Sequence, residues 1–162
     1  MTKQVPFDEG AEVSIPKISN ENADEKSCGC IILKNDKVLL IGARDDDGNL
    51  YWSFPKGHQE EGETDIETAL RETREEVGLD VEVINNTPIK TWHLVHSGTV
   101  RKEILLFTAK PLNGDVKIQE AEVERAEWVS IDKVNEYLDE YYSDVWADFL
   151  RSFSGYLSSS TG

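Results

Sequence analysis

The 162-residue sequence predicts a single α+β domain in which a mixed β-sheet is sandwiched between helices. Three observations support this fold class. The chain is about as long as one ordinary domain. Several short apolar stretches, separated by polar or glycine-containing turns, have the pattern of β-strands. Two longer stretches have apolar residues at helical spacing.

The strands predicted for the compact part of the chain begin at residue 29. The apolar stretches Gly29–Leu33 and Val38–Ile41 flank the polar residues Lys34–Lys37, which predicts a hairpin. The next strand, Tyr51–Phe54, is short because Pro55 ends it. The remaining predicted strands are Val81–Asn85, Ile89–His96, Val100–Ala109, Asp115–Ile118 and Trp128–Val129, with a turn at Ser97–Gly98.

Two helical regions complete the predicted fold. Thr64 is a suitable N-cap for a helix over Asp65–Val77, and Gly78 is a typical C-terminal stop. The second region starts at a predicted N-cap, Ser130, and has two parts. These parts are Ile131–Leu138 and, after a break, Val145–Phe153. The buried side of the first helix is predicted to consist of Ile66, Ala69, Leu70, Thr73 and Val77.

Residues 1–26 are predicted to form a flexible N-terminal arm, because they contain prolines and acids but few large apolar residues. Within it, Glu12–Ile15 is expected to form a short edge strand. The compact domain is predicted over residues 27–156, and a soft C-terminal tail over residues 157–162. The sequence has no stretch apolar enough to span a membrane and no signal-peptide pattern at its start.

The chain carries 17 Lys and Arg against 32 Asp and Glu, a net charge of −15. This charge argues against binding to DNA or to an anionic membrane, since both require clustered basic residues. A phosphate-bearing substrate remains compatible if divalent cations lie between the negative charges. Cys28 and Cys30 could form half of a metal site, but the sequence lacks a second ligand pair. We expect core residues in a reducing, cytoplasmic setting.

Glu72, Glu75 and Glu76 form an acidic face on the first predicted helix. At about 100° per residue they occupy a wedge about 100° wide, away from the apolar stripe. Their mutual repulsion costs stability, and Arg71 and Arg74 relieve part of it. Such oxygen ligands suit Mg²⁺ or Mn²⁺. A solvated acidic face explains the helix alone equally well.

The segment before this helix favours metal binding, since its glycines allow close backbone approach and leave a carbonyl free to act as a ligand. Gly57–Leu79 (GHQEEGETDIETALRETREEVGL) resembles the Nudix box, G-x5-E-x7-R-E-U-x-E-E-x-G-U, in which U is apolar. Thr73 stands where an aliphatic residue is usual, and its methyl group can still pack. The seven fixed residues are all present: Gly57, Glu63, Arg71, Glu72, Glu75, Glu76 and Gly78.

The resemblance to the Nudix family implies the Nudix fold and a role for each box residue. Glu72, Glu75, Glu76 and the Gly57 carbonyl are expected to bind Mg²⁺, with Mn²⁺ as an alternative. Glu72 is alternatively the general base, or the residue that orients it. The metals would activate a water and stabilise phosphate charge while a carboxylate removes the proton of the water. Glu63 and Arg71 are expected to form a salt bridge that holds the loop on the helix.

The family often adds a carboxylate from a loop outside the box as a metal ligand or general base. Glu122 lies six residues before Trp128, a spacing that resembles the diadenosine tetraphosphate hydrolase branch. We therefore expect Glu122 to have this catalytic and metal-binding role. The other candidates are Glu120, Glu124 and Glu127, and a solvated acidic loop is the alternative for most of this cluster.

The residues Tyr51–His58 (YWSFPKGH) resemble the W-x-x-P-K-G-H lead-in of dinucleoside polyphosphate hydrolases. The resemblance implies that Lys56, His58 and Lys102 face the polyphosphate and that Trp92 stacks on a nucleobase. The alternatives are ordinary surface residues and, for Trp92, a core position. His93 and His96 are expected to face the substrate or simply to be exposed.

The leading hypothesis is a hydrolase that cleaves diadenosine tetraphosphate to ATP and AMP, without a covalent enzyme intermediate. Within the same family, the alternative substrates are diphosphoinositol polyphosphates, oxidised nucleotides and RNA 5′-pyrophosphates. A non-catalytic nucleotide sensor with the Nudix fold is a different kind of alternative. Such modules typically lose box carboxylates, and this chain retains all four.

Overall fold

The computed structural model of the chain describes residues 25–95 and 98–161, with the side chains of residues 95 and 154–161 left out. The strands are β1 (Glu25–Lys34), β2 (Lys37–Arg44), β3 (Leu50–Ser53), β4 (Lys56–His58), β5 (Asp80–Val95), β6 (Val100–Asn113) and β7 (Val123–Ser130). The helices are α1 (Asp65–Val77), a short 3₁₀ helix (Ile131–Glu136) and α2 (Glu140–Thr161). The strand expected at Glu12–Ile15, and His96 and Ser97, lie outside the described residues.

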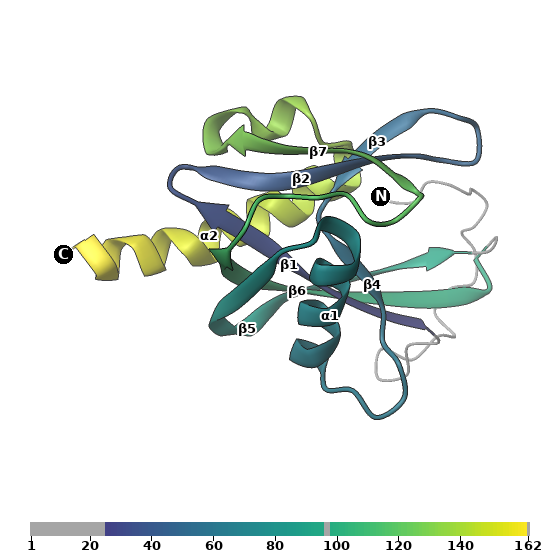
Figure 1. The fold of residues 1–162 in the computed structure, drawn as a ribbon, viewed down its shortest axis with the longest axis horizontal. Helices are drawn as coiled ribbons and strands as arrows, with labels where there is room; N and C mark the ends of the chain where they lie inside the picture. The colour runs from purple at the N-terminus through teal and green to yellow at the C-terminus, as the bar shows by residue number, and fades with distance from the viewer. Residues whose placement is uncertain (1–24, 96–97, 162) are drawn as a thin grey trace.

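The described strands form one seven-stranded sheet with the central order β3-β2-β1-β6-β5. β4 pairs with β1, and β7 pairs with β2. The sheet is mixed, because β1 and β6 run parallel while the other pairs are antiparallel. α1 lies on one face and α2 on the other (Figure 1). The predicted fold class, a mixed sheet between helices, is therefore confirmed.

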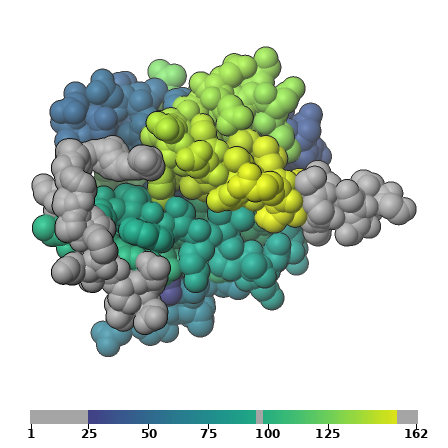
Figure 2. All heavy atoms as spheres, turned by 180° about the vertical axis from the view of Figure 1, so that it is seen from behind, coloured from purple at the N-terminus to yellow at the C-terminus, as the bar shows by residue number. Residues whose placement is uncertain are grey.

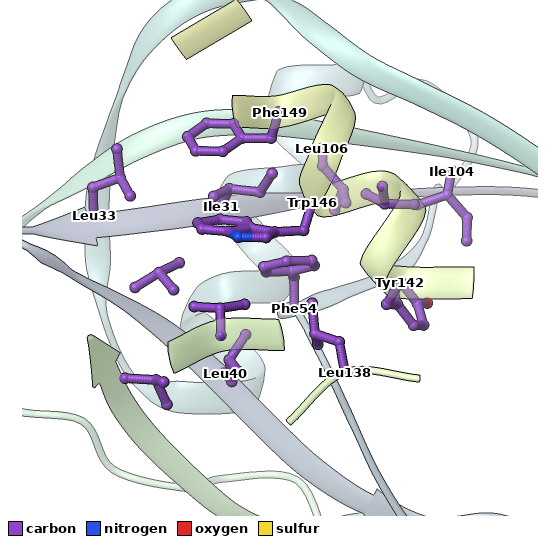
Figure 3. Close-up of a cluster of buried hydrophobic side chains, with 14 residues drawn as sticks. Ile31, Leu33, Leu40, Phe54, Ile104, Leu106, Leu138, Tyr142, Trp146 and Phe149 are labelled. Atoms are coloured by element: carbon purple, nitrogen blue, oxygen red, sulfur yellow. The ribbon is translucent and has the colours of Figure 1, made fainter. Parts of the chain in front are cut away.

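Each face of the sheet buries its own hydrophobic cluster, because successive side chains of a strand point to opposite faces. On the α2 face, the Trp146 ring stacks on Phe54 and Phe149, with centroid distances of 6.2 and 5.0 Å (Figure 3). Viewed from this side, α2 crosses the surface between β5 and the 3₁₀ segment (Figure 2). On the α1 face, Cys28 and Cys30 are fully buried free thiols, as expected of core residues.

α1 spans the predicted residues because both of its ends carry strong signals. The Thr64 hydroxyl accepts a hydrogen bond from the Glu67 amide, and the Glu67 carboxylate accepts one from the Thr64 amide. Gly78 adopts a left-handed conformation with φ of 72°, and its N–H donates to the Arg74 carbonyl. The predicted apolar stripe is confirmed, with three buried and two partly buried residues: Ala69, Thr73, Val77, Ile66 and Leu70.

The strand predictions are wrong in three places. β4 is not predicted, because its pairing with β1 is a long-range contact without local periodicity. Asp115–Ile118 is not a strand, and the Lys117 amide instead donates to the Val77 carbonyl at the end of α1. The two strands predicted between residues 81 and 96 are parts of the single strand β5, whose register shifts between Asn85 and Ile89.

The second helical region also differs from its prediction. Its first part is a 3₁₀ helix that ends at Glu136, and the Ser130 side chain does not cap it. α2 begins at Glu140, before the predicted Val145, and continues to Thr161. In the part of the chain that the structure describes, no helix is both long and apolar enough to cross a membrane.

Candidate active site at helix α1

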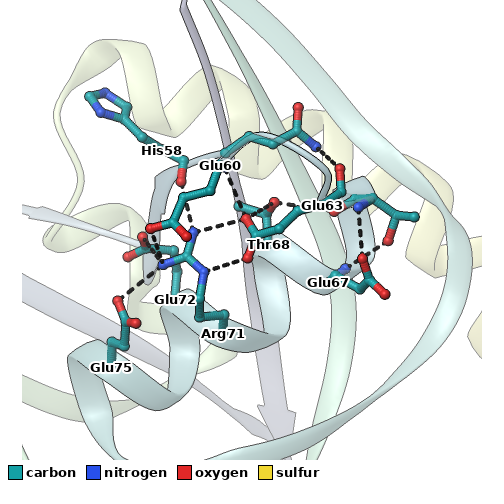
Figure 4. Close-up of polar contacts among 10 residues, drawn as sticks. His58, Glu60, Glu63, Glu67, Thr68, Arg71, Glu72 and Glu75 are labelled. Atoms are coloured by element: carbon teal, nitrogen blue, oxygen red, sulfur yellow. Dashed lines mark hydrogen bonds and ion pairs between the residues drawn. The ribbon is translucent and has the colours of Figure 1, made fainter.

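Arg71 ties the loop between β4 and α1 to the helix (Figure 4). Its guanidinium makes a two-point ion pair with Glu63, with N–O distances of 2.6 and 3.0 Å. It also donates to the His58 carbonyl at 2.9 Å, to Glu72 at 2.9 Å and to Glu75 at 3.1 Å. Hydrogen bonding to Arg71 is the largest effect that lowers the pKa of Glu63, to about 2. The structure thus contains the predicted Glu63–Arg71 salt bridge.

Gly57 lies directly against the Glu72 carboxylate. A Cβ atom at position 57 would be 2.1 Å from the Glu72 carboxyl carbon, so the Glu72 carboxylate would have to move to admit one. The Glu72 side chain is only 13% exposed, whereas that of Glu75 is 48% exposed. The Glu72 carboxylate therefore packs directly against the β4 backbone at Gly57.

Glu76 is the most unusual of the box carboxylates. Its Oε1 atom accepts a hydrogen bond of 3.1 Å from the Lys56 amide. Burial raises the pKa of Glu76 to about 7, and the charges of Glu72 and Glu120 add to this rise while Lys56 opposes it. A buried carboxylate of this kind is stabilised in its ionised form by a nearby cation.

The box carboxylates fit a divalent metal by the chemistry of their oxygen atoms. Mg²⁺ and Mn²⁺ prefer oxygen ligands, and Glu72, Glu75 and Glu76 supply them on one face of α1. Across residues 25–95 and 98–161, no three His, Cys, Asp or Glu side chains already surround a common metal position. Arg71 contacts Glu72 and Glu75 instead, so a metal would compete with Arg71 for their oxygens.

Two of the four candidates for the distal carboxylate have other partners. The Glu124 carboxylate lies 3.0 Å from the Arg44 guanidinium. The Glu127 carboxylate accepts a hydrogen bond of 3.1 Å from the Tyr137 hydroxyl.

Glu120 is the candidate whose pKa is raised by the charges of the box carboxylates. Burial, a hydrogen bond with Glu122, and the charges of Glu72 and Glu75 all raise the pKa of Glu120. Glu120 in turn raises the pKa of Glu76. The Gln119 amide donates a 2.9 Å hydrogen bond to the Glu76 carbonyl, so Glu120 directly follows a residue that is bound to the end of α1. Glu122, the residue expected from the sequence, is hydrogen-bonded to Glu120.

The three residues of β4 point alternately to the two faces of the sheet. Gly57 pairs with Cys28 and faces α1, whereas Lys56 and His58 pair with Gly29 and Ser27 on the side of α2. His58 is exposed, and its Nε2 atom lies 3.9 Å from a Glu25 carboxylate oxygen.

Lys56, Lys102 and His93 form a basic group on the α2 face. Burial and then the charge of Lys56 lower the pKa of Lys102. Burial and then both lysines lower the pKa of His93 to about 4. The Lys56 ammonium lies 5.7 Å from the centroid of the Tyr142 ring, and the His93 ring lies 4.8 Å from that of Tyr141. Two predicted substrate residues, Lys56 and Lys102, are thus brought together.

Trp92 lies on the opposite face from this basic group. In the β5–β6 ladder His93 is opposite Lys102 and Trp92 is opposite Glu103, so their side chains alternate. Trp92 is 42% exposed, and the Arg101 guanidinium lies 4.9 Å from its ring centroid. The structure does not bring Trp92 together with the other predicted substrate residues.

Tyr142 is a site residue that the sequence does not predict. It is buried on α2, and burial is the first cause that raises its pKa, followed by the charges of Tyr51, Asp139 and Glu76. Its place beneath the Lys56 ammonium results from the packing of α2 on the sheet. The adjacent tyrosines at positions 141 and 142 are the only local signal.

Comparisons with known proteins bear on this site. Residues 25–149 match the family model of the NUDIX domain. The mutator protein MutT4 of Mycobacterium tuberculosis is 37% identical over 95 residues, which cover 58% of this chain and 38% of that protein. The mouse bis(5′-nucleosyl)-tetraphosphatase [asymmetrical] is 41% identical over 63 residues, covering 34% of this chain and 43% of that protein. The match therefore spans less than half the length of either relative.

The crystal structure of a C. elegans Ap4A hydrolase binary complex resembles the fold with a TM-score of 0.68 and 21% identity. It covers 81% of this chain and 98% of that one. This structural likeness supports the architecture of the sheet and helices. Because the family model covers most of the sequence and the box lies on α1 as the family pattern requires, the chain belongs to the Nudix family.

Proposed function

We propose that the chain is a metal-dependent hydrolase that cleaves a phosphoanhydride bond of a nucleoside diphosphate derivative. The observation that carries this proposal is the arrangement around β4. The carboxylates of Glu72 and Glu76 lie against its backbone, and the ammonium groups of Lys56 and Lys102 lie on its other face. A carboxylate side suits a cation, and a basic side suits the phosphates of the substrate.

Each residue of the site has a role in this proposal. Glu72, Glu75, Glu76 and the Gly57 carbonyl would hold Mg²⁺, or Mn²⁺. When bound, the cation lowers the pKa of a water and stabilises charge on the leaving phosphate. Glu63 and Arg71 keep the loop against α1. Glu120 accepts the proton of the attacking water, which its raised pKa suits, and Glu122 is the second candidate for this step.

For the substrate, we propose diadenosine tetraphosphate, cleaved to ATP and AMP. The mouse relative named as an asymmetrical tetraphosphatase supports this substrate. The basic group supports it as well, since Lys56 and Lys102 offer positive charge to phosphates beyond the cleaved bond. His58, on the same face, is included in this phosphate site. Trp92 is a separate candidate for base stacking. Buried free thiols at two positions support the cytoplasmic setting expected from the sequence.

Product analysis by anion-exchange chromatography in the presence of Mg²⁺ tests the proposal. The panel consists of diadenosine tetraphosphate, ADP-ribose, diphosphoinositol pentakisphosphate, oxidised dGTP and a 5′-triphosphorylated RNA. ATP and AMP released much faster than the products of any other compound would support the proposed substrate. Preferential turnover of another compound would keep the hydrolase and replace the substrate. Tight binding of one compound without turnover of any would favour the sensor hypothesis.

A further inference from the structure

Gly29 of β1 is in unusually close contact with β4. It pairs with Lys56 in the β1–β4 ladder. A Cβ atom at position 29 would lie 2.0 Å from the Pro55 carbonyl oxygen and 2.5 Å from the Lys56 Cβ atom. The nearer obstacle is a backbone atom, so rotation of a side chain cannot relieve the overlap. β4 therefore approaches β1 this closely because residue 29 has no side chain.

The backbone of Pro55 and Lys56, which lies against Gly29, also contacts the candidate active site. The Cys30 amide donates a 3.1 Å hydrogen bond to the Pro55 carbonyl, which fixes this segment on β1. The next amide, that of Lys56, donates to Glu76 on α1. The side chain of the same Lys56 extends over Tyr142. One residue thus contacts both the carboxylate side and the basic side.

We propose that Gly29 is a positioning residue for Lys56. Its missing side chain sets the separation of β4 from β1. This separation places the Lys56 amide against Glu76 and the Lys56 ammonium in the basic group. The inference rests on the proposed function, because it assigns Gly29 to the same site. A displacement of about 1 Å in such a site can cost about 10²-fold in rate.

Steady-state kinetics of Gly29→Ala, measured well below its melting temperature, test the inference. We expect kcat to fall about 10- to 100-fold and KM to rise, because both contacts of Lys56 are displaced. Gly42→Ala is the matched control: its Cβ atom would first meet a Leu50 side-chain methyl at 3.3 Å, which can move. This control should leave kcat and KM within about twofold of the wild type. A Gly29→Ala protein with a lower melting temperature but unchanged kcat and KM would overturn the proposal.

A double variant separates the two contacts of Lys56. Lys56→Met should raise KM with little loss of kcat, since its amide remains. Gly29→Ala combined with Lys56→Met should then keep the KM of Lys56→Met and the kcat of Gly29→Ala. Effects on KM that simply multiply would contradict a shared route through Lys56.

Amide hydrogen exchange, followed by NMR, tests the placement of β4 without turnover. The wild-type Lys56 amide should exchange slowly, and this protection should be lost in Gly29→Ala but not in Gly42→Ala. If Gly29→Ala does not fold, exchange in the wild type still tests the contact of the Lys56 amide with Glu76 on which the inference depends. A Lys56 amide that exchanges as fast as that of Asp46, in the exposed turn after β2, would overturn the inference. If the wild type turns over no substrate, the proposed function fails while this measurement still decides the role of Gly29.

Discussion

Arg71 is the residue that connects the acidic face of α1 with the loop that precedes it. Its guanidinium contacts Glu63, Glu72 and Glu75 and the carbonyl of His58. A single cation therefore offsets part of the repulsion among the carboxylates and fixes the loop backbone. The resulting depression of the Glu63 pKa makes this contact visible in the pH dependence of stability.

Glu63→Gln should reveal that dependence. The pKa of Glu63 is about 2 in the folded chain against an ordinary value of 4.5. A group with a depressed pKa stabilises the fold fully above its unfolded pKa, and the contribution disappears as the pH falls through the folded pKa. The difference in urea midpoint between wild type and variant should therefore shrink steadily between pH 4.5 and pH 2.

Glu61→Gln is the control for this measurement, because Glu61 is an exposed residue of the same loop. Its midpoint should stay close to that of the wild type throughout the pH range. A difference between wild type and Glu63→Gln that does not change with pH would contradict the assigned ion pair.

The distal carboxylate can be assigned by comparing Glu120→Gln with Glu122→Gln. Glu120 is the residue whose pKa responds to Glu72 and Glu75, so we expect it to accept the proton of the water. Loss of a general base typically lowers kcat about 10²- to 10⁴-fold, whereas Glu122→Gln should cost less than about tenfold. A larger loss in Glu122→Gln would return the role to Glu122, the residue favoured by sequence spacing.

Lys102→Met tests the basic group. Methionine keeps the length of the side chain but removes the charge that we propose to face the phosphates, so KM should rise on the order of tenfold with a smaller change in kcat. Lys110→Met is the control, since Lys110 lies on the same strand and its ammonium is 3.5 Å from Glu82. Equal KM values for the two variants would remove Lys102 from the substrate site.

Among the secondary-structure elements, α1 holds the box carboxylates in register and depends on its N-terminal cap. The Thr64 hydroxyl accepts a hydrogen bond from the Glu67 amide, and replacement of such a cap by alanine costs about 1 kcal/mol. Thr64→Ala should lower the free energy of unfolding by about this amount in urea titrations. KM should not change, because the cap lies at the end of α1 away from Glu76.

Thr87→Ala serves as the control for Thr64→Ala. Thr87 is exposed in the irregular part of β5, so its replacement should change the free energy of unfolding by less than about 0.5 kcal/mol. If the two variants are equally stable, the capping box does not stabilise α1.

The elements also differ in how far the sequence predicts them. The limits of α1 follow from Thr64 and Gly78, because caps and left-handed stops are local features. β4 and the long strand β5 depend on pairing between distant residues, which local patterns do not contain. The stretch Asp115–Ile118 has the composition of a strand, but the Lys117 amide bonds to the Val77 carbonyl at the end of α1 instead.

At the scale of the whole molecule, the sheet separates a group of acidic side chains from a group of basic side chains, and both groups contact β4. The acidic residues of the box lie on the α1 face, and the basic group lies on the α2 face. In a chain with a net charge of −15, such a local basic group is a specific feature rather than a general property of the surface.

The sequence identifies the box residues, because their spacing along one helix is itself the pattern. It does not distinguish Glu120 from Glu122, since that choice depends on how the loop before β7 lies against α1. It also does not predict that Trp92 and Lys102 lie on opposite faces, because this follows from the register of β5 and β6. Long-range packing decides both points.

The central claim is that the α1 carboxylates hold a divalent metal that the hydrolysis requires. Turnover of diadenosine tetraphosphate and Mn²⁺ binding, measured side by side for the wild type and Glu76→Gln, test it most directly. Glutamine keeps the shape of the side chain, so the variant should keep the wild-type melting temperature. Its kcat should fall by about 10²-fold or more, and its affinity for Mn²⁺ should weaken. Near-normal turnover or unchanged Mn²⁺ affinity in Glu76→Gln would contradict the account.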